Sequence, residues 1–493
     1  MNRPNILWIC TDQQRWDTLS YLGHPGARTP NLDKLARQGV LFDRAYCQSP
    51  ICTPSRASFL SGKYPIAHGV HKNGNAGFPN HTTLVPKLFR DAGYRTGLIG
   101  KLHLSRAEGV VEERPIDDGY DEFYWSHHPD PDWPEKHDYH DWLKDKGIDA
   151  AAIYDPSRAY GAGVDSNLHQ TRWAGDRAKS FIRRHKGKPW FLSMNLFDPH
   201  PPFDPPLEYL KKFDRNKMPG PIFAESDIAH QQRFVDVDQQ ARVAIDPRRG
   251  DPDNQLYEGT PERDASATHD TPPDIYDAKQ IQACYHAMIA FIDDMVGELM
   301  DELDLTGQRG DTIVLFMSDH GELLGDHGLI YKGCRFYEGL TRVPMMFSWP
   351  EKIRDGVISR ALVELVDIPQ TLLEAAGLPE PLGMQGRSLY PLLSGVLPAD
   401  RHKSHVLCEY FDALGLPEGR KSRATMYFDG RYKLCIYHGV DLGELYDLQQ
   451  DPQELNDLWE SPDFAELRCR LIAKHFDAMM LASEPGPVRV ASY

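Results

Sequence analysis

The sequence predicts an α/β fold: an α/β/α sandwich in which a sheet is layered between helices, followed by a small C-terminal α+β subdomain with an antiparallel sheet. Two observations predict the sandwich. Short apolar runs alternate with helical patterns over residues 1–399, and four of these runs end in polar side chains. A third observation predicts the subdomain. From about residue 400 the chain changes to short strand-like runs that are separated by turn residues and followed by one helix.

Four strands and four helices are predicted in the larger domain. Short apolar runs bounded by turn residues are typical of buried strands, and they occur at 5–11, 95–100, 190–197 and 312–318. Apolar residues at helical spacing predict helices at 29–40, at 83–94, from 176 onward and at 279–304. The first helix has the usual terminal signals, with Thr29 as its N-cap, Pro30 in its first position and Gly39 near its end.

Two polar stretches, residues 125–165 and 203–275, interrupt this alternation. They are rich in Pro, Asp and His, and loops of this length are usually lids or interaction segments. The histidine-rich run HHPDPDWPEKHDYHDW (127–142) fits no standard metal-ligand spacing, so we interpret it as part of a lid or rim. The aromatic residues that could shape a pocket there are Trp125, Trp133 and Tyr160.

The smaller subdomain is predicted at residues 400–493, after a larger domain at 1–399. Its strands are predicted at 404–411, 423–430, 431–438 and 443–448, and its helix at 463–481.

Composition narrows the class of protein. The formal net charge of −17 argues against a nucleic-acid partner or an anionic membrane, although it does not fix the sign of charge inside a cleft. No apolar run reaches the roughly 18–20 residues that span a bilayer, and MNRPNILWICTD lacks the features of a secretory signal. The eight cysteines form no CxxC pair, which favours buried free thiols. Together these features predict a cytoplasmic protein.

Polar residues that are capable of chemistry follow each of the four predicted strands. They are Asp12 and Gln13, then Lys101 and His103, then His200, and finally Asp319 and His320. Ligands in open α/β sheets bind outside the carboxyl ends of the strands, so these side chains are predicted to meet in one cleft. Taken one at a time, each could instead be a turn residue, a solvated lysine or a core histidine.

The stretch SPICTPSRASFLSGKYP (49–65) places a cysteine at the start of a predicted helix. Thr53 is a suitable cap, Pro54 a suitable first residue and Gly62 a suitable end. Cys52 would then lie at the positive end of the helix, with Arg56 one turn further on, which favours an activated nucleophile. From these residues alone, a buried structural cysteine remains the alternative.

These residues resemble the type I sulfatases of the alkaline-phosphatase superfamily. CTPSR matches the C-x-P-S-R signature of that family, in which the cysteine is oxidised to formylglycine. The other matching stretches, in the order usual for the family, are NILWICTDQQ, TPNLDKLARQGVLFDRAY, GLIGKLHL, DPHPPF, SDHGELLGDHGLIYKG, RVPMMFSWP and GELYDLQQDPQELNDL. The resemblance covers essentially the whole chain and implies an alkaline-phosphatase-like fold, an α/β/α sandwich around a large, mixed and mostly parallel sheet.

The resemblance also implies a divalent metal, usually calcium. The ligands implied here are Asp12, Gln13, Asp319, His320 and the modified Cys52. Hard carboxylates suit calcium or magnesium. Many sulfatases have an acidic residue in place of Gln13 and an asparagine in place of His320; the pattern here is more similar to choline sulfatases and phosphonate monoester hydrolases. The nitrogen ligand shifts the expectation somewhat toward manganese or zinc.

Further roles are implied residue by residue. Lys101 and Lys332 would bind the sulfate oxygens, and His200 together with Lys332 would assist the departing oxygen. His103 would act as a base when sulfate is released. Arg56 would orient the aldehyde hydrate, and Asn73 would reach the substrate. A formylglycine-generating enzyme would be a partner during maturation.

The predicted function is therefore hydrolysis of a sulfate monoester to an alcohol and inorganic sulfate. The alternative is a phosphonate monoester or phosphodiester hydrolase that uses the same formylglycine, which Gln13 and His320 allow, although the paired Lys101 and His103 resemble sulfatases. A third hypothesis is a non-catalytic scaffold that binds sulfated ligands. Three substrates remain alternatives: choline sulfate, an aryl sulfate and a sulfated sugar. Many relatives assemble as oligomers, so a homo-oligomer is an open expectation.

Overall fold

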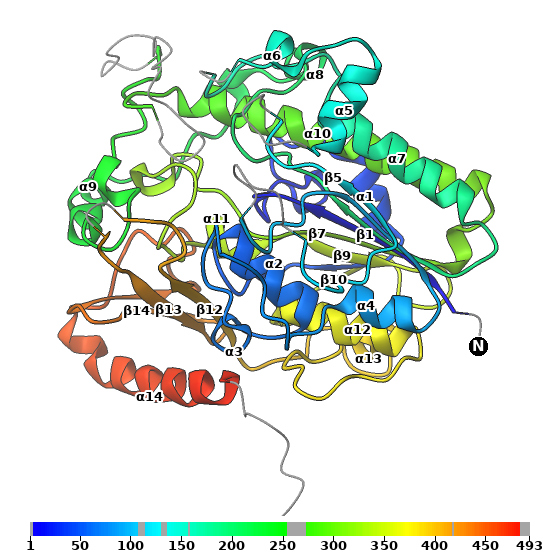
Figure 1. Ribbon diagram of the computed structural model, residues 1–493. Helices are drawn as coiled ribbons and strands as arrows, with labels where there is room; N and C mark the ends of the chain where they lie inside the picture. The colour runs from blue at the N-terminus through cyan, green and yellow to red at the C-terminus, as the bar shows by residue number, and fades with distance from the viewer. Residues whose placement is uncertain are drawn as a thin grey trace, which may run out of the picture.

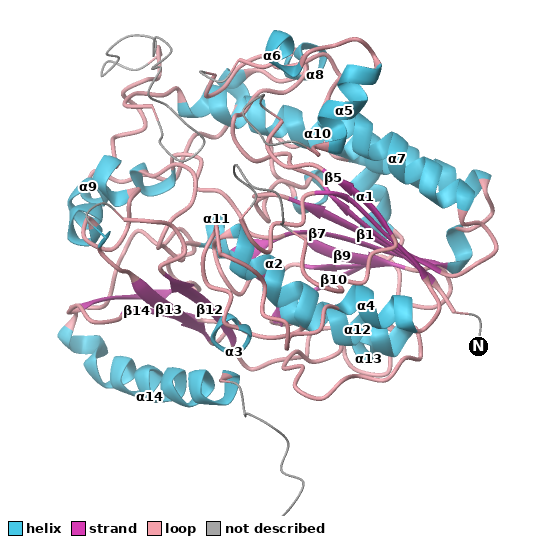
Figure 2. Cartoon of the chain, viewed as in Figure 1, coloured by secondary structure: helices cyan, strands magenta, loops and turns pink. Residues whose placement is uncertain are grey.

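The computed structural model describes residues 3–106, 114–129, 136–155, 158–253, 273–416 and 419–483. A large central sheet lies between two layers of helices, and a smaller sheet with its own helix lies beside it (Figures 1 and 2). The predicted fold class is confirmed. The predicted boundary at residue 399 is not tested and stays a prediction. Within the described ranges, no helix combines the length and apolar character that crossing a bilayer requires.

The central sheet has eight strands in the order β10-β2-β9-β7-β1-β6-β4-β5. Its strands are β1 (Asn5–Thr11), β2 (Val40–Phe42), β4 (Arg95–Gly100), β5 (Glu122–Trp125), β6 (Trp190–Asn195), β7 (Thr312–Ser318), β9 (Met345–Ser348) and β10 (Val357–Ser359). The five strands from β7 to β5 are all parallel, whereas β9 runs antiparallel to both of its neighbours. The four predicted strands, at β1, β4, β6 and β7, therefore lie next to one another in the sheet.

The helices and short 3-10 turns connect these strands. The α-helices are α1 (Pro30–Arg37), α2 (Cys52–Ser61), α3 (Pro65–His68), α4 (Val85–Asp91), α5 (Asp138–Asp145), α6 (Ala150–Ile153), α7 (Gln170–Arg184), α8 (Leu207–Leu210), α9 (Ser226–Gln231), α10 (Ala278–Leu305), α11 (Glu338–Thr341), α12 (Ile368–Ala375), α13 (Tyr390–Leu393) and α14 (Ala465–Ala482). The 3-10 helices are η1 (Ser20–Leu22), η2 (Arg215–Lys217), η3 (Gln232–Phe234), η4 (Ala241–Val243), η5 (Arg309–Asp311), η6 (Asp326–Gly328), η7 (Leu365–Asp367) and η9 (Pro462–Phe464).

Alternate residues of each central strand face opposite helical layers. On β1, Leu7 and Ile9 belong to an apolar cluster with α1, α7 and α10, whereas Ile6 and Trp8 belong to a cluster with α2, α4 and α12. Both faces are therefore buried. This explains why these strands read as continuous apolar runs rather than as an apolar–polar alternation.

The smaller sheet is fully antiparallel, as predicted. Its order is β12 (Val406–Phe411), β13 (Arg423–Phe428), β14 (Tyr432–Tyr437) and β15 (Leu442–Asp447). One face packs against α14, and the other joins the apolar cluster that includes Trp8. A third, three-stranded sheet is formed by β3 (Ala45–Tyr46), β8 (Arg342–Val343) and β11 (Val363–Glu364).

The end of one helix and the start of another differ in detail from the prediction. Helix α1 ends at Arg37, because Val40 already begins β2. Helix α2 begins at Cys52 itself, and the Thr53 side chain provides no cap. Instead, the side chain of Asn73 accepts a hydrogen bond from the backbone N–H of Thr53 at 3.1 Å. A residue that is distant in sequence thus replaces the predicted local cap.

The two polar stretches contain only short helical segments in their described parts. Residues 136–155 hold α5 and α6, and residues 203–253 hold α8, α9 and three 3-10 turns. Trp133 and most of 254–275 lie outside the described residues. Their role as lids stays a prediction.

A buried acid on β12 makes stability depend on pH. Glu409 is 1% exposed, and burial raises its pKa from 4.5 to about 8, against the opposing effect of the Ile66 backbone N–H. The unfolded chain loses this proton near pH 4.5, so the folded state loses stability as pH rises from about 4.5 to about 8. The unfolding free energy of the parent protein should fall between pH 5 and pH 8. In Glu409→Gln we expect this fall to be smaller by about 3 kcal/mol.

Urea unfolding of both proteins at these two pH values measures this difference. Parallel pH profiles for the parent protein and the variant would show that Glu409 is already ionised in the folded state.

Candidate active site

The polar residues predicted at the four strand ends meet in one buried cluster. Asp12 follows β1, Lys101 follows β4, and Asp319 follows β7, and these strands lie within four positions of the sheet order. Each predicted residue of this cluster is at most 8% exposed: Asp12, Gln13, Cys52, Arg56, Lys101, His103, His200, Asp319, His320 and Lys332. The structure thus brings these ten predicted residues to one place.

The turn after β1 positions the first carboxylate. Gln13 adopts a positive φ of 67°, a region that non-glycine residues rarely occupy, and its backbone N–H donates to Asp319 Oδ1 at 3.0 Å. Such backbone strain costs on the order of 1–3 kcal/mol and persists where the surroundings enforce it. Here it ties the ends of β1 and β7 together, so that the carboxylates of Asp12 and Asp319 converge.

Cys52 lies between these carboxylates and two basic groups. Its Sγ is 3.1 Å from His320 Nε2, 3.6 Å from Asp12 Oδ1 and 3.0 Å from Lys332 Nζ. Burial and Asp12 raise the pKa of the thiol, but Lys101, Lys332 and His320 outweigh them and lower it. Residue 52 is therefore in a field that stabilises negative charge on its side chain.

Arg56 holds the two carboxylates in place. Its Nε donates to Asp319 Oδ2 at 2.9 Å, its Nη2 to Asp12 Oδ2 at 3.1 Å and its Nη1 to the Lys101 carbonyl at 3.0 Å. These donors point at the carboxylates and the carbonyl. The predicted role of orienting a hydrate therefore stays a prediction, while the observed contacts indicate a positioning role.

Two lysines and a histidine surround the position where an anion would bind. Lys101 Nζ is 2.6 Å from Asp12 Oδ2 and 3.8 Å from Cys52 Sγ. Lys332 Nζ is 2.8 Å from Gln13 Oε1 and 2.9 Å from His200 Nε2. Burial and the charge of Lys332 lower the pKa of His200 far below its usual value, so its ring is neutral.

His103 and Asn73 lie nearby, with different surroundings. His103 has a positive φ of 55° and packs edge-to-face on His127, at 4.5 Å between ring centroids. Burial and Lys101 lower its pKa well below 6.5, which leaves a neutral ring that can accept a proton. Asn73, predicted to reach the substrate, uses its side-chain oxygen to cap α2.

A divalent cation fits this cluster. Asp12, Cys52, Asp319 and His320 each offer a ligand atom, and all four atoms lie within 4.8 Å of one another. Burial opposes charge on His320, yet Asp319 and Cys52 raise its pKa to about 9, so the local field favours positive charge there. Gln13 directs its amide oxygen to Lys332 and its amide nitrogen to Glu322. The Gln13 side chain thus contacts Lys332 and Glu322, and its predicted role as a metal ligand stays a prediction.

Sequence reasoning missed several residues that support the site. Glu322 is fully buried and accepts hydrogen bonds from Gln13 and from the backbone N–H groups of Leu323 and Tyr331. It thereby fixes the loop that leads to Lys332. The acid is visible in the sequence SDHGELLGDHG, but its spacing carries no signal of this bracing role.

A second brace comes from the C-terminal sheet. Arg335, three residues after Lys332, donates to Glu444 on β15 at 2.7 Å and to the Tyr437 hydroxyl at 3.0 Å. Asp238 accepts a hydrogen bond from the Cys334 backbone N–H at 2.7 Å. The loop that carries Lys332 is thus held by residues from two distant parts of the chain.

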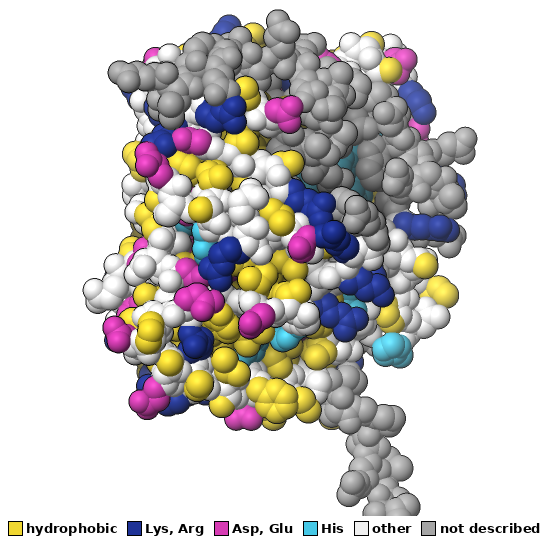
Figure 3. Space-filling view, turned by 90° about the vertical axis from the view of Figure 1, so that its left-hand side faces the viewer, with side chains coloured by type: hydrophobic (Ala, Val, Ile, Leu, Met, Phe, Trp, Pro, Cys, Tyr) yellow, Lys and Arg dark blue, Asp and Glu magenta, His cyan; other side chains and the backbone are white. Residues whose placement is uncertain are grey.

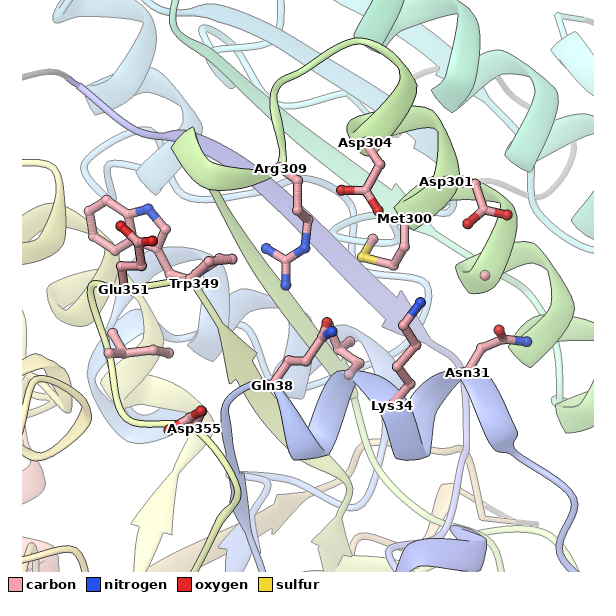
Figure 4. Close-up of a pocket in the computed structure, with 14 residues that line it drawn as sticks. Asn31, Lys34, Gln38, Met300, Asp301, Asp304, Arg309, Trp349, Glu351 and Asp355 are labelled. Atoms are coloured by element: carbon pink, nitrogen blue, oxygen red, sulfur yellow. The ribbon is translucent and has the colours of Figure 1, made fainter.

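A separate cleft of about 390 Å³ lies at the opposite edge of the sheet (Figure 4). Arg309, which precedes β7, and Trp349, which follows the antiparallel β9, both line it. Lys34 and Gln38 enter from α1, and Asp304 from the end of α10. Because these residues lie at the amino end of β7, the cleft is remote from Cys52.

Comparison with known proteins gives matches over most of the chain. A family model described as sulfatase matches residues 4–378, and one described as the C-terminal part of N-sulphoglucosamine sulphohydrolase matches residues 325–479. An arylsulfatase of Clostridium perfringens is 29% identical over 482 residues, covering 94% of this chain and 92% of the relative. An N-acetylglucosamine-6-O-sulfatase of Bacteroides thetaiotaomicron is 28% identical over 514 residues, covering 95% and 85%.

Among solved structures, a phosphonate monoester hydrolase of Agrobacterium radiobacter has a similar fold. Its TM-score is 0.79 at 26% sequence identity, and the match covers 97% of this chain and 96% of that chain.

Proposed function

This chain belongs to the sulfatase family, and from that premise we propose that it hydrolyses a sulfate monoester with a formylglycine made from Cys52. The observation that carries the proposal is the position of Cys52, with its Sγ 3.0 Å from Lys332 Nζ and 3.1 Å from His320 Nε2 inside a buried group of ligand atoms. The sequence CTPSR would be read by a formylglycine-generating enzyme during maturation.

The aldehyde explains why a thiol would be replaced. Its hydrate carries two hydroxyls on one carbon. One hydroxyl oxygen forms a bond to sulfur while the bond from sulfur to the ester oxygen breaks, which releases the alcohol. The second hydroxyl then loses its proton, the bond from carbon to the sulfate oxygen breaks, and the aldehyde returns. Water adds to it for the next cycle.

Side chains around residue 52 supply the proton transfers and charge. Lys101 and Lys332 hold the sulfate oxygens, where negative charge grows in the transition state. The neutral His200 ring, 2.9 Å from Lys332 Nζ, relays a proton to the departing oxygen. His103, also neutral, accepts the proton when sulfate leaves.

A divalent cation would be held by Asp12, Asp319, His320 and residue 52. Gln13, whose amide oxygen contacts Lys332, would lie beside these ligands. A bound cation would lower the pKa of an attached hydroxyl and neutralise charge on the sulfate. Two carboxylates favour calcium, and the histidine nitrogen admits manganese or zinc; magnesium is a further alternative. Arg56 keeps both carboxylates in the geometry that the cation requires.

The phosphonate monoester hydrolase remains the alternative, because its fold matches this chain with a TM-score of 0.79. Turnover of 4-nitrophenyl sulfate and of a phenylphosphonate monoester by the same preparation separates the two functions. We expect the higher kcat/KM for the sulfate. A clear preference for the phosphonate would assign the chain to the alternative.

The brace behind Lys332 gives a further prediction. Glu444→Gln removes the charge partner of Arg335, so the loop that carries Lys332 loses its fixed position. We expect kcat to fall about 10-fold for 4-nitrophenyl sulfate. The loss should be larger for phenyl sulfate, because its leaving group depends more on a proton from the Lys332–His200 pair.

The control is Asp447→Asn, which removes a buried ion-paired acid from the same strand. Equal losses for both esters in Glu444→Gln would show a general structural effect instead of a positioning role.

A further inference from the structure

A strip of basic side chains lies beside the proposed active site. Lys72, Arg106, Lys421 and Arg423 are all exposed. We call these four residues the basic rim. The protein as a whole has a formal net charge of −17, so the sign of charge on these four residues is opposite to that of the molecule. In Figure 3, Lys and Arg side chains gather near the middle of the face that carries the C-terminal sheet.

Short contacts join the two parts of the rim. The backbone N–H of Asn73 donates to the Ala413 carbonyl at 3.0 Å, and Lys72 Nζ is 3.3 Å from Asp412 Oδ2. Arg423 pairs with Phe411 in the β12–β13 register, and Ser422, between Lys421 and Arg423, donates its backbone N–H to Asp412 Oδ1 at 3.0 Å. The loop at 71–75 and the start of β13 are thus adjacent, although about 350 residues separate them in sequence.

The basic groups of the rim also act on a common neighbour. The ring centroids of His71 and Phe411 are 5.0 Å apart, and the Arg423 guanidinium lies 5.9 Å from the same Phe411 ring. Burial lowers the pKa of His71, and the charges of Arg423 and Lys72 lower it further. Arg106 is the third basic residue beside this loop, because its backbone N–H donates to the Asn75 carbonyl at 2.8 Å. The carboxylate of Asp412 offsets only part of this positive charge.

The basic rim and residue 52 are connected through the loop at 71–75. Asn73, the neighbour of Lys72, accepts a hydrogen bond from the backbone N–H of Thr53 at the start of α2. A substrate whose sulfate lies at residue 52 therefore has the 71–75 loop immediately beside it. The side-chain Nδ2 of Asn75 in this loop is buried and has no hydrogen-bond partner among the described residues.

We propose that the basic rim binds a second anionic group of the substrate, so that the preferred substrate is a saccharide carrying more than one sulfate or carboxylate. This inference rests on the proposed sulfatase function and specifies its substrate class. The sulfate that is cleaved lies between Lys101 and Lys332, and a further anionic group lies on the rim. Long-range attraction to several cations raises both the affinity and the association rate for such a polyanion.

Binding without turnover gives the first test. A trisulfated heparin disaccharide is titrated into the Cys52→Ala protein, with and without Lys421→Gln and Arg423→Gln. We expect the double substitution to weaken Kd about 10-fold or more at low salt, and the difference to shrink as salt rises. Lys144→Gln with Arg470→Gln, at two exposed basic residues away from the rim, makes the matched control.

Kinetics with the unsubstituted Cys52 give the second test. The rim variant should raise KM for the disaccharide and leave kcat/KM for 4-nitrophenyl sulfate unchanged. An unchanged Kd, or equal losses in the rim and control variants, would overturn the rim as a binding site. Absence of turnover with both esters would overturn the sulfatase function itself, while the Kd values would still decide whether the rim binds the polyanion.

Discussion

Cys52→Ser is expected to stop multiple turnover, with kcat reduced about 10³-fold or more. A serine hydroxyl can attack sulfur and release the alcohol, because Lys332 and His320 lie close to residue 52 as they do in the parent protein. The resulting sulfate ester has no second hydroxyl on the same carbon, so the elimination that regenerates the aldehyde cannot occur. One alcohol per protein molecule should be released, and then the reaction should stop.

The measurement is a rapid-mixing burst of 4-nitrophenol, together with peptide mass spectrometry over residues 45–56. The parent protein should show the aldehyde, and the serine variant a stable sulfate adduct. Cys52→Ala is the control, in which neither a burst nor an adduct should form. Sustained turnover by Cys52→Ser would contradict the aldehyde mechanism.

Asp319→Asn should abolish metal binding and reduce turnover about 10²–10³-fold. The substitution removes a ligand charge from the group that contains Asp12, Cys52 and His320. It also removes the carboxylate that pairs with Arg56 Nε at 2.9 Å, so Arg56 keeps only its contacts with Asp12 and with the Lys101 carbonyl. Elemental analysis after dialysis and kcat with 4-nitrophenyl sulfate give the two readouts.

The matched control for this variant is Glu454→Gln. Glu454 is also buried and ion-paired, with Lys433 at 2.8 Å, but it lies outside the metal-ligand group. Like Asp319→Asn, the Glu454→Gln variant should be less stable than the parent protein because a buried ion pair is lost. It should still bind the metal and turn over 4-nitrophenyl sulfate. If Asp319→Asn retained one metal ion per protein molecule, Asp319 would not be a metal ligand.

Much of the site was predictable because its residues follow local patterns. Asp12, Lys101, His200 and Asp319 come directly after apolar runs, and the carboxyl ends of parallel strands meet at one edge of a sheet. Helix α2 could also be located from Pro54 and Gly62, although it begins at Cys52, two residues before the expected first residue, Pro54. The resemblance in CTPSR then identified residue 52 among eight cysteines.

The remaining contacts depend on residues that no local pattern connects. Asn73 caps α2 from 20 positions away, and Arg56 pairs with Asp319 across 263 positions. Arg335 reaches Glu444 across 109 positions, which makes the C-terminal sheet a support for Lys332. Such pairs form only when the sheet order and the packing of both layers are set.

The sequence by itself determined four strands of the central sheet and the polar residues at their ends, and it pointed to Cys52 as the cysteine that we propose is modified, because periodicity and motif are local properties of a chain. Only the tertiary structure shows that Arg56 binds the carboxylates and that Asn73 caps helix α2. It also places Lys72 and Arg423 near the same histidine, His71. The reason is that hydrogen bonds and ion pairs depend on distances of a few ångströms, and folding alone brings remote residues that close.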